Sequence, residues 1–330
     1  KPLMKKVIIL TAGFGEGHNA AARNLRDALE LSSKDLQVEV LDLFASSYGR
    51  LNTLVQRAYL GVVRYAPSLW SGIYSLLDKA SVSDEGIGGL HRLRTALGDV
   101  LRATQPDCVV STYPAYAPII RELFRDHSER PFRLVTVVTD SISINASWYR
   151  APSDAFVVPN EPSAAVLRDA GVDAEKIHAL GFPVSPEFGA PGAVPAELTP
   201  NERVRLLYII NTGKQKYGKA LDRLVENERH ELTITTGRHA ELKSELQERF
   251  RGVKDRVQIL GWTNQMPALM LSHHIVIGKA GGAVVQETIA ARCPMIVNQV
   301  IPGQEAGNAR LIEEFQIGAD RKSTRLNSSH

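Results

Sequence analysis

The sequence has little cysteine, no long hydrophobic run and almost no net charge, and each shortage excludes a class of protein. The two cysteines among 330 residues, Cys108 and Cys293, both adjoin apolar runs, which favours buried thiols in a reducing compartment over a disulfide framework. The net charge of +3 is too small to indicate nucleic-acid binding. No apolar stretch approaches the roughly 20 residues of a transmembrane helix. If the protein acts at a membrane, we expect it to lie on the surface.

Strand-length apolar runs alternate with helix-type spacing along the whole chain, which predicts βαβ units and parallel sheets. The Pro- and Gly-rich stretch 183–203 lacks periodicity and is typical of a linker. We therefore expect an α/β fold of two doubly wound domains, residues 1–185 and 204–330, joined by residues 186–203. The predicted strands are residues 6–11, 38–43, 107–112, 134–139 and 155–158, then 205–210, 231–236, 256–260, 274–278 and 294–298.

A glycine loop with a histidine follows the first strand. In "ILTAGFGEGHNA", residues 9–20, alternate glycines lead into a helix whose first N–H groups can face a ligand. A dinucleotide fingerprint would place its third glycine where His18 stands, although Asp42 ends the second strand where a ribose-binding acid would lie. A nicotinamide site therefore stays open. His18 is either a capping or solvated histidine, or a general base kept neutral by the positive end of the helix.

A second glycine site follows the strand at residues 274–278. Lys279, Ala280, Gly281 and Gly282 run directly into a helix, which again offers N–H donors to an anion. Glu287 lies one to two turns further and can accept from ribose hydroxyls. The stretch "PGQEAGN" then presents Gln304, Glu305 and Asn308, whose side chains suit a sugar. The alternatives are a tight strand-to-helix turn and a solvated carboxylate.

These stretches, with "VVTDSISINASW" and "ILGWTNQMPALM", resemble the monogalactosyldiacylglycerol synthase and processive diacylglycerol glucosyltransferase group of glycosyltransferase family 28. The peptidoglycan lipid-intermediate N-acetylglucosaminyltransferase is a more distant likeness. The resemblance covers residues 5–320 and implies a GT-B fold, with two Rossmann-like domains facing each other across a cleft. It implies an acceptor and membrane-side N-terminal domain, a UDP-sugar-binding C-terminal domain, and inversion of the anomeric centre without a metal.

By this resemblance His18 is the catalytic base. There is no Asp-x-Asp motif, so a metal-chelating donor site has no support, and we expect no cofactor and no metal, the UDP-sugar being a substrate. The donor-binding residues are expected to be Gly213, Trp262, Lys279, Gly281, Gly282, Glu287, Gln304, Glu305 and Asn308. The acceptor and membrane residues are expected to be Gly15, Gly17, Tyr65, Trp70, Tyr74 and Asp140.

The expected protein is thus a UDP-sugar-dependent hexosyltransferase that moves galactose or glucose from a UDP-hexose to diacylglycerol. It would be cytoplasmic and peripheral on the inner face of the cell membrane, with an anionic membrane surface as partner and no nucleic acid. Three alternatives stay open: another lipid acceptor such as a polyprenyl-linked one, a UDP-sugar epimerase, and a non-catalytic nucleotide-sugar sensor.

Four features depart from the family pattern or allow two interpretations. Asn145 stands where close relatives carry a histidine, and "NTGKQKYG" replaces a triple glycine. The aromatic stretch 44–80 is either a packed helix pair or a lipid-facing surface with interleaved arginines. The polar ending "IGADRKSTRLNSSH" predicts neither a further strand nor an apolar helix, so we expect a C-terminally truncated chain in which residues 321–330 are non-native.

Overall fold

The computed structural model describes residues 4–13, 16–47, 90–127, 129–210, 217–301 and 305–320. The expected site residues Gly15, Tyr65, Trp70, Tyr74, Gly213 and Gln304 lie outside these ranges. The chain divides into two compact units: unit 1 comprises residues 1–185 with 301–307, and unit 2 comprises residues 186–300 with 308–330. Each unit is built around its own parallel sheet.

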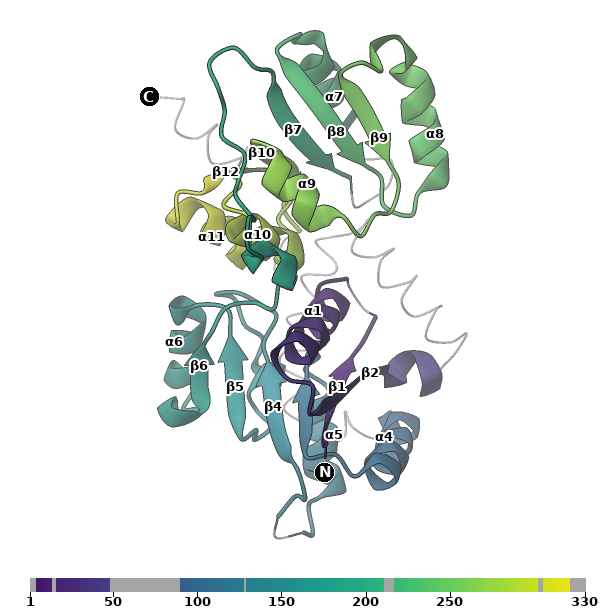
Figure 1. Cartoon of the computed structure of the whole chain (residues 1–330). Coiled ribbons are helices and arrows are strands. Elements are labelled where there is room, and N and C mark those ends of the chain that lie inside the picture. Colours follow the sequence, from purple (N-terminus) through teal and green to yellow (C-terminus); the bar gives the residue numbers. More distant parts are fainter. Residues whose placement is uncertain are drawn as a thin grey trace. The chain divides into compact units, whose positions relative to one another are not determined.

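Unit 1 holds a six-stranded parallel sheet in the order β2-β1-β3-β4-β5-β6 (Figure 1). Its strands are β1 (Lys5–Thr11), β2 (Leu36–Asp42), β3 (Cys108–Ser111), β4 (Arg133–Val137), β5 (Ala155–Val158) and β6 (Ile177–Ala179). Its helices are α1 (Glu16–Ser32), α4 (His91–Thr104), α5 (Tyr116–Leu123) and α6 (Glu161–Asp169), with short 3-10 turns η2 (Ala146–Trp148) and η3 (Ala174–Lys176).

The strands of unit 1 are apolar on both faces because helices cover both sides of the sheet. Ile8 of β1 belongs to a buried cluster with Leu97 of α4. Its neighbour Ile9 points to the other face and belongs to a cluster with Ala22 of α1. This arrangement leaves the carboxyl ends of the strands as the place where loops can collect functional side chains.

Unit 2 holds a second parallel sheet, in the order β12-β11-β10-β7-β8-β9. Its strands are β7 (Val204–Ile209), β8 (His230–Thr235), β9 (Val257–Leu260), β10 (Ile275–Lys279), β11 (Met295–Gln299) and β12 (Gly318–Asp320). Its helices are α7 (Tyr217–Glu226), α8 (Ala240–Arg249), α9 (Met266–Ser272), α10 (Gly282–Ala290) and α11 (Ala306–Glu314), with 3-10 turns η4 (Pro186–Gly189) and η5 (Arg251–Val253).

The packing of unit 2 follows the same physical rule. Leu221 of α7 and Leu246 of α8 are fully buried against Leu232 of β8, in one cluster. The stretch before β7 also belongs to this unit: η4 contacts α9, and the Ala196 N–H donates to the carbonyl of Leu271, 2.7 Å away.

The doubly wound fold expected from the sequence is confirmed, and all ten predicted strands are present within one or two residues. The expectation that no strand follows residue 316 is wrong, because Gly318–Asp320 pairs with β11 as an edge strand. This strand has three residues and no apolar run, so its pairing rests on main-chain hydrogen bonds that leave no pattern in the sequence. The equally short β6 was missed for the same reason.

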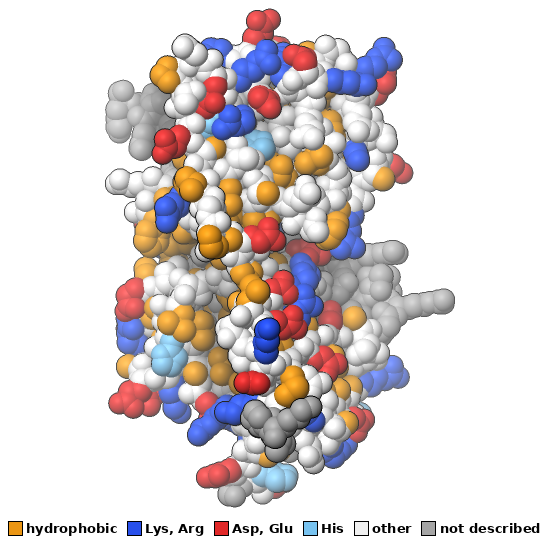
Figure 2. All heavy atoms as spheres, in the orientation of Figure 1, with side chains coloured by type: hydrophobic (Ala, Val, Ile, Leu, Met, Phe, Trp, Pro, Cys, Tyr) orange, Lys and Arg blue, Asp and Glu red, His pale blue; other side chains and the backbone are white. Residues whose placement is uncertain are grey.

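Charged side chains of both signs are interspersed over the face of the molecule that Figure 2 shows. On that face the described residues form no continuous patch of a single charge, in keeping with the net charge of +3. Among the described residues, no helix combines the length and the apolar composition that membrane crossing requires.

Candidate active site

The carboxyl ends of three neighbouring strands in unit 1 converge on His18. The histidine lies in the first turn of α1, just after β1 and its glycine loop. Thr112 and Tyr113 directly follow β3, and Thr139 follows β4. Because β1, β3 and β4 are adjacent in the sheet, a main-chain carbonyl 94 residues away and a side-chain hydroxyl 121 residues away in the chain meet at one imidazole ring.

The hydrogen bonds of His18 define its tautomer. Nδ1 lies 3.0 Å from the carbonyl oxygen of Thr112 and 2.8 Å from Oγ1 of Thr139. A carbonyl oxygen can only accept a hydrogen bond, so Nδ1 carries the proton and donates it. No hydrogen bond joins Nε2 to any residue within the described ranges, which leaves its lone pair able to take a proton from a substrate.

Aromatic rings surround the histidine and set its protonation. Tyr113 meets the imidazole edge-on, with ring centroids 5.1 Å apart, and Trp148 lies at 5.9 Å. Burial lowers the pKa of His18 to about 4, and the hydrogen bond to the Thr112 carbonyl opposes this to a smaller extent. The ring is therefore neutral near pH 7, as a general base must be before it acts.

Asp140 belongs to the same site through a tryptophan. Trp148 is only 1% exposed, and its Nε1 donates to Oδ2 of Asp140 over 2.7 Å. Burial raises the pKa of Asp140 to about 6, while the hydrogen bond from Trp148 has a smaller, opposite effect. Asn145 accepts from the N–H of Ser147 and caps the short turn that carries Trp148. At the position where the family resemblance led us to expect a histidine, Asn145 thus helps to place Trp148.

A hydrogen bond joins the start of the glycine loop to the end of β2. Oδ2 of Asp42 accepts the main-chain N–H of Gly13 at 2.9 Å, and its Oδ1 accepts that of Ala45. The carboxylate that a dinucleotide site would use for ribose is thus engaged by the protein's own backbone, which disfavours the nicotinamide hypothesis. A Cβ at Gly17 would meet nothing within 4 Å, so no atom of the described residues demands glycine there.

In unit 2, four expected donor-site residues meet after β10. The strand ends at Lys279 with a register shift against β11, and Gly281 caps α10 without any side-chain hydrogen bond to the helix end. Asn308 of α11 is 5% exposed and donates from Nδ2 to the carbonyl of Ala280, 3.1 Å away, while its buried Oδ1 has no hydrogen-bond partner among the described residues. Gly282 begins α10, so N–H groups and an amide side chain meet at this end of the sheet.

The other described donor-site candidates take separate positions. Glu287 is partly buried in the second turn of α10. Glu305 is 4% exposed, and its Oε2 accepts the N–H of Ile301 at 2.9 Å, so its carboxylate holds the chain that leads into α11. Trp262 follows β9 and is 61% exposed, with the guanidinium of Arg238, from the loop after β8, 5.5 Å from its ring.

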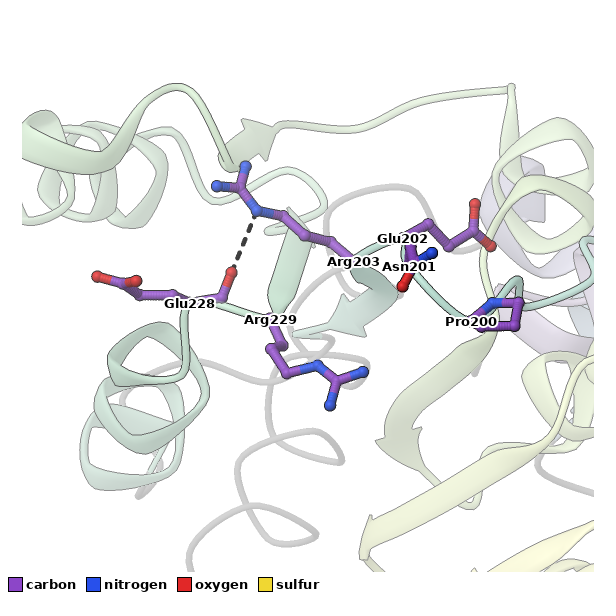
Figure 3. A pocket seen from close by; sticks show the side chains of 6 residues that line it. All are labelled: Pro200, Asn201, Glu202, Arg203, Glu228 and Arg229. Carbon is purple, nitrogen blue, oxygen red and sulfur yellow. Dashed lines mark hydrogen bonds between the residues drawn. The ribbon is translucent and has the colours of Figure 1, made fainter.

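A hollow of about 430 Å³ lies at the amino ends of β7 and β8, the end of the unit 2 sheet opposite to the donor-site candidates (Figure 3). Arg203 donates from Nε to the Glu228 carbonyl, 3.1 Å away. Figure 3 shows the side chains of Arg203 and Arg229 pointing away from each other, so the lining groups do not converge on a common point. Nor does any cluster of three or more metal-ligating side chains occur among the residues that the structure describes.

Sequence reasoning found His18 and Asp140 but missed the groups that join them. Thr139 and Trp148 lie in the quoted stretch "VVTDSISINASW", yet nothing in that stretch says which side chain reaches His18. Thr112 and Tyr113 had only one signal: Thr112 ends the predicted strand 107–112, and Tyr113 follows it. The sheet order, which the sequence does not state, decides these contacts.

Comparison with known proteins gives two family matches. The model described as monogalactosyldiacylglycerol (MGDG) synthase matches residues 18–184, and the glycosyltransferase family 28 C-terminal domain matches residues 210–314. A processive diacylglycerol beta-glucosyltransferase of Staphylococcus aureus (strain MRSA252) is 26% identical over 323 residues, which cover 95% of this chain and 80% of that protein.

Two solved structures show the fold. UGT89C1 of Arabidopsis thaliana, complexed with UDP-L-rhamnose, is 13% identical with a TM-score of 0.60, over 96% of this chain and 84% of its own. A Listeria monocytogenes protein, provisionally named UDP-N-acetylglucosamine 2-epimerase, is 13% identical with a TM-score of 0.54, over 95% of this chain and 83% of its own. The expected GT-B fold is confirmed, and since a protein complexed with UDP-L-rhamnose and a protein named as an epimerase both share it, the fold does not choose the reaction.

Proposed function

The chain belongs to the monogalactosyldiacylglycerol synthase family, and from this premise we propose that it transfers glucose or galactose from a UDP-hexose to diacylglycerol. The observation that carries the proposal is the neutral imidazole of His18, whose Nδ1 is held by Thr112 and Thr139 while Nε2 is left to accept a proton. Transfer to a hydroxyl requires such a base, because a neutral alcohol is a weak nucleophile.

The proposed step moves one proton and exchanges one bond. Nε2 of His18 takes the proton of the diacylglycerol hydroxyl as its oxygen attacks the anomeric carbon. The bond from that carbon to the UDP oxygen breaks, and UDP leaves with the electron pair. Attack from the face opposite the leaving group inverts the anomeric centre. The N–H groups at Gly281 and Gly282, with Lys279, stabilise the charge that develops on the diphosphate.

Donor recognition is assigned to the carboxyl ends of β9 and β10. The exposed ring of Trp262, backed by Arg238, offers a stacking surface for uracil. Glu287 is proposed to accept from the ribose hydroxyls, and the buried Asn308 to meet the sugar. Gly213, Gln304 and Glu305 complete the proposed donor site.

The acceptor side is assigned to unit 1 and to a membrane. We assign Asp140, Gly15 and Gly17 to the acceptor side of the site, and the aromatic residues Tyr65, Trp70 and Tyr74 to contact with lipid. The protein would then work as a peripheral protein on the cytoplasmic face of the cell membrane, against an anionic surface. Both hexoses stay in the proposal, because the S. aureus relative is named for glucose and the family model for galactose.

A UDP-sugar epimerase is the second candidate, because the Listeria monocytogenes protein named as one has the same fold. The epimerase and the transferase differ in whether they require a lipid acceptor. An epimerase converts UDP-sugar with no lipid present, whereas the proposed transferase releases UDP only when an acceptor hydroxyl is available.

The test follows UDP-glucose, UDP-galactose and UDP-N-acetylglucosamine by NMR, with the chain alone and with vesicles that contain diacylglycerol or a polyprenyl phosphate. We expect release of UDP from a UDP-hexose with diacylglycerol vesicles and not without them. Epimer formation in the lipid-free sample would replace the proposal with the epimerase. UDP release only with polyprenyl phosphate would change the acceptor, and binding without any conversion would indicate a sensor.

A further inference from the structure

Two loops from different strands hold the same nitrogen of His18. Thr112 is fully buried; its N–H donates to the carbonyl of Leu10, 2.9 Å away, and its Oγ1 lies 3.3 Å from the main-chain oxygen of His18. Its carbonyl is therefore fixed relative to both β1 and α1. Thr139 is 5% exposed and brings its hydroxyl to Nδ1 from the end of β4.

These contacts are compatible with one neutral tautomer. If Nε2 carried the proton, the Nδ1 lone pair would face the lone pairs of the Thr112 carbonyl at 3.0 Å, and no hydrogen bond could form there. The Thr139 hydroxyl can act as donor or acceptor, so it adapts to either tautomer; the carbonyl cannot. With the proton on Nδ1, both oxygens accept from it in a shared hydrogen bond.

The same two oxygens become more important when the ring gains charge. Protonation of Nε2 creates an imidazolium beside Tyr113 and Trp148, in surroundings that disfavour charge. The nearby carboxylate of Asp140 accepts from Trp148. Within the described residues, the groups hydrogen-bonded to Nδ1 are thus the Thr112 carbonyl and the Thr139 hydroxyl, and hydrogen bonds from a charged donor are the stronger kind.

We propose that the main-chain carbonyl of Thr112 fixes His18 in the Nδ1–H tautomer, so that Nε2 is the atom that takes the acceptor's proton, and that the Thr139 hydroxyl, as a second acceptor for Nδ1–H, stabilises the ring once it is protonated. The inference rests on the proposed function for the identity of the reaction. In that reaction the acceptor O–H breaks, its proton moves to Nε2, and the Nδ1–H bond stays intact throughout. Thr139 touches neither sugar nor lipid in this scheme, so it is a positioning residue.

The first test reads the tautomer directly. Histidine labelled with a heavy nitrogen isotope gives separate NMR signals for protonated and unprotonated ring nitrogens, and the His18 signals are identified by their loss in His18→Gln. We expect wild type at about pH 7 to show protonated Nδ1 and unprotonated Nε2. A predominant Nε2–H tautomer in wild type would overturn the proposal without the need for any Thr139 variant.

The second test uses three variants of two buried threonines, Thr136 in β4 and Thr139 just after it. Thr139→Val removes the oxygen, Thr139→Ser keeps it, and Thr136→Val is a matched control, because Thr136 of β4 bonds to Ser153 at 2.7 Å and not to His18. We expect Thr139→Val to keep the Nδ1–H tautomer, to lower kcat about tenfold and to shift the acidic limb of the kcat–pH profile to lower pH, with KM for UDP-hexose within about twofold. Thr139→Ser and Thr136→Val should retain the wild-type tautomer and most of kcat.

The outcomes separate the two proposals. Thr139→Val with an unchanged kcat and an unchanged kcat–pH profile would contradict the role of Thr139. Equal losses of kcat in Thr139→Val and Thr136→Val would also contradict it, since the effect would then be general loss of packing. A wild-type chain with the Nδ1–H tautomer but no hexosyl transfer would contradict the proposed function and support the tautomer assignment.

Discussion

At the scale of single residues, one physical effect acts in opposite directions on two groups of the site. Burial penalises charge, so it lowers the pKa of His18 to about 4 and raises the pKa of Asp140 to about 6. The first shift keeps the proposed base neutral. The second makes the ionised form of Asp140 unfavourable for the fold near neutral pH.

Asp140→Asn should therefore stabilise the protein at neutral and alkaline pH. Asp140 binds its proton more tightly in the folded state, with a pKa of about 6 against an ordinary 3.8, so its favourable contribution is complete below about pH 4 and is lost as pH rises through about 6. Asparagine keeps an oxygen for Nε1 of Trp148. We expect the free energy of unfolding to rise by about 1–3 kcal/mol at about pH 8 and to match wild type near pH 4.

Urea unfolding at about pH 4, 6 and 8, followed by tryptophan fluorescence, measures this difference. An Asp140→Asn protein that is less stable than wild type at about pH 8 would show that the ionised carboxylate stabilises the site. In that case the electrostatic interpretation of Asp140 is wrong.

Trp262 carries a prediction about the donor. If its exposed ring stacks on uracil, Trp262→Ala should weaken UDP binding about fivefold to a hundredfold, because base–aromatic stacking contributes about 1–3 kcal/mol. Trp262→Phe should recover much of the loss. The matched control is Phe315→Ala, at a side chain 54% exposed beyond the end of α11. Calorimetric titration with UDP measures the affinity of each variant. Equal UDP affinity of Trp262→Ala and wild type would remove Trp262 from the donor site.

The sequence singled out the proposed base more readily than the residues around it. His18 was identifiable because a glycine loop between an apolar run and a helix is a local pattern. Its partners Thr112 and Thr139 were not identifiable, because the contacts depend on which strands are neighbours. The sequence also predicted a different cause for the neutral ring. It predicted that the positive end of α1 disfavours the charged form, whereas burial beside Tyr113 and Trp148 is the largest cause of the lowered His18 pKa.

At the scale of elements, the longer strands were predictable and the three-residue strands were not. A run such as residues 6–11 is apolar throughout because both sheet faces are covered, and that composition is visible in the sequence. In β12 the informative residue is Gly318, which allows the main chain to approach β11 closely. A Cβ at Gly318 would lie 1.8 Å from the carbonyl oxygen of Met295.

Gly318→Ala should therefore separate β12 from β11. The main-chain oxygen of Met295 cannot move freely inside a paired strand, so we expect a loss of about 1–3 kcal/mol of stability. The Met295 N–H, which donates to the Ile317 carbonyl at 2.9 Å, should exchange faster with solvent. Gly252→Ala is the control, because a Cβ there meets nothing within 4 Å. Equal stability and exchange in the two variants would contradict the close-approach argument.

At the scale of the whole molecule, attraction to a membrane has to come from local surfaces, since the net charge is only +3. On the face in Figure 2 the charges of both signs are mixed. The proposed lipid contacts, including Trp70 and Tyr74, lie outside the described residues. Membrane binding is therefore a proposal that needs its own measurement.

Flotation with vesicles provides that measurement. We expect more protein on vesicles of phosphatidylglycerol with diacylglycerol than on phosphatidylcholine with diacylglycerol, and less binding at high salt, because salt screens surface charge. Replacing both Trp70 and Tyr74 with serine should reduce binding to both kinds of vesicle. Equal binding to both lipids at every salt concentration would contradict an anionic partner surface.

Formation of a glycolipid tests hexosyl transfer most directly. Radiolabelled UDP-glucose and UDP-galactose are each incubated with diacylglycerol vesicles and either wild type or His18→Gln, and the lipid fraction is separated and counted. We predict labelled hexosyl-diacylglycerol from at least one donor with wild type. His18→Gln should form at least about a hundredfold less while binding UDP equally well. No labelled lipid from either donor, or equal product from both proteins, would contradict hexosyl transfer by His18.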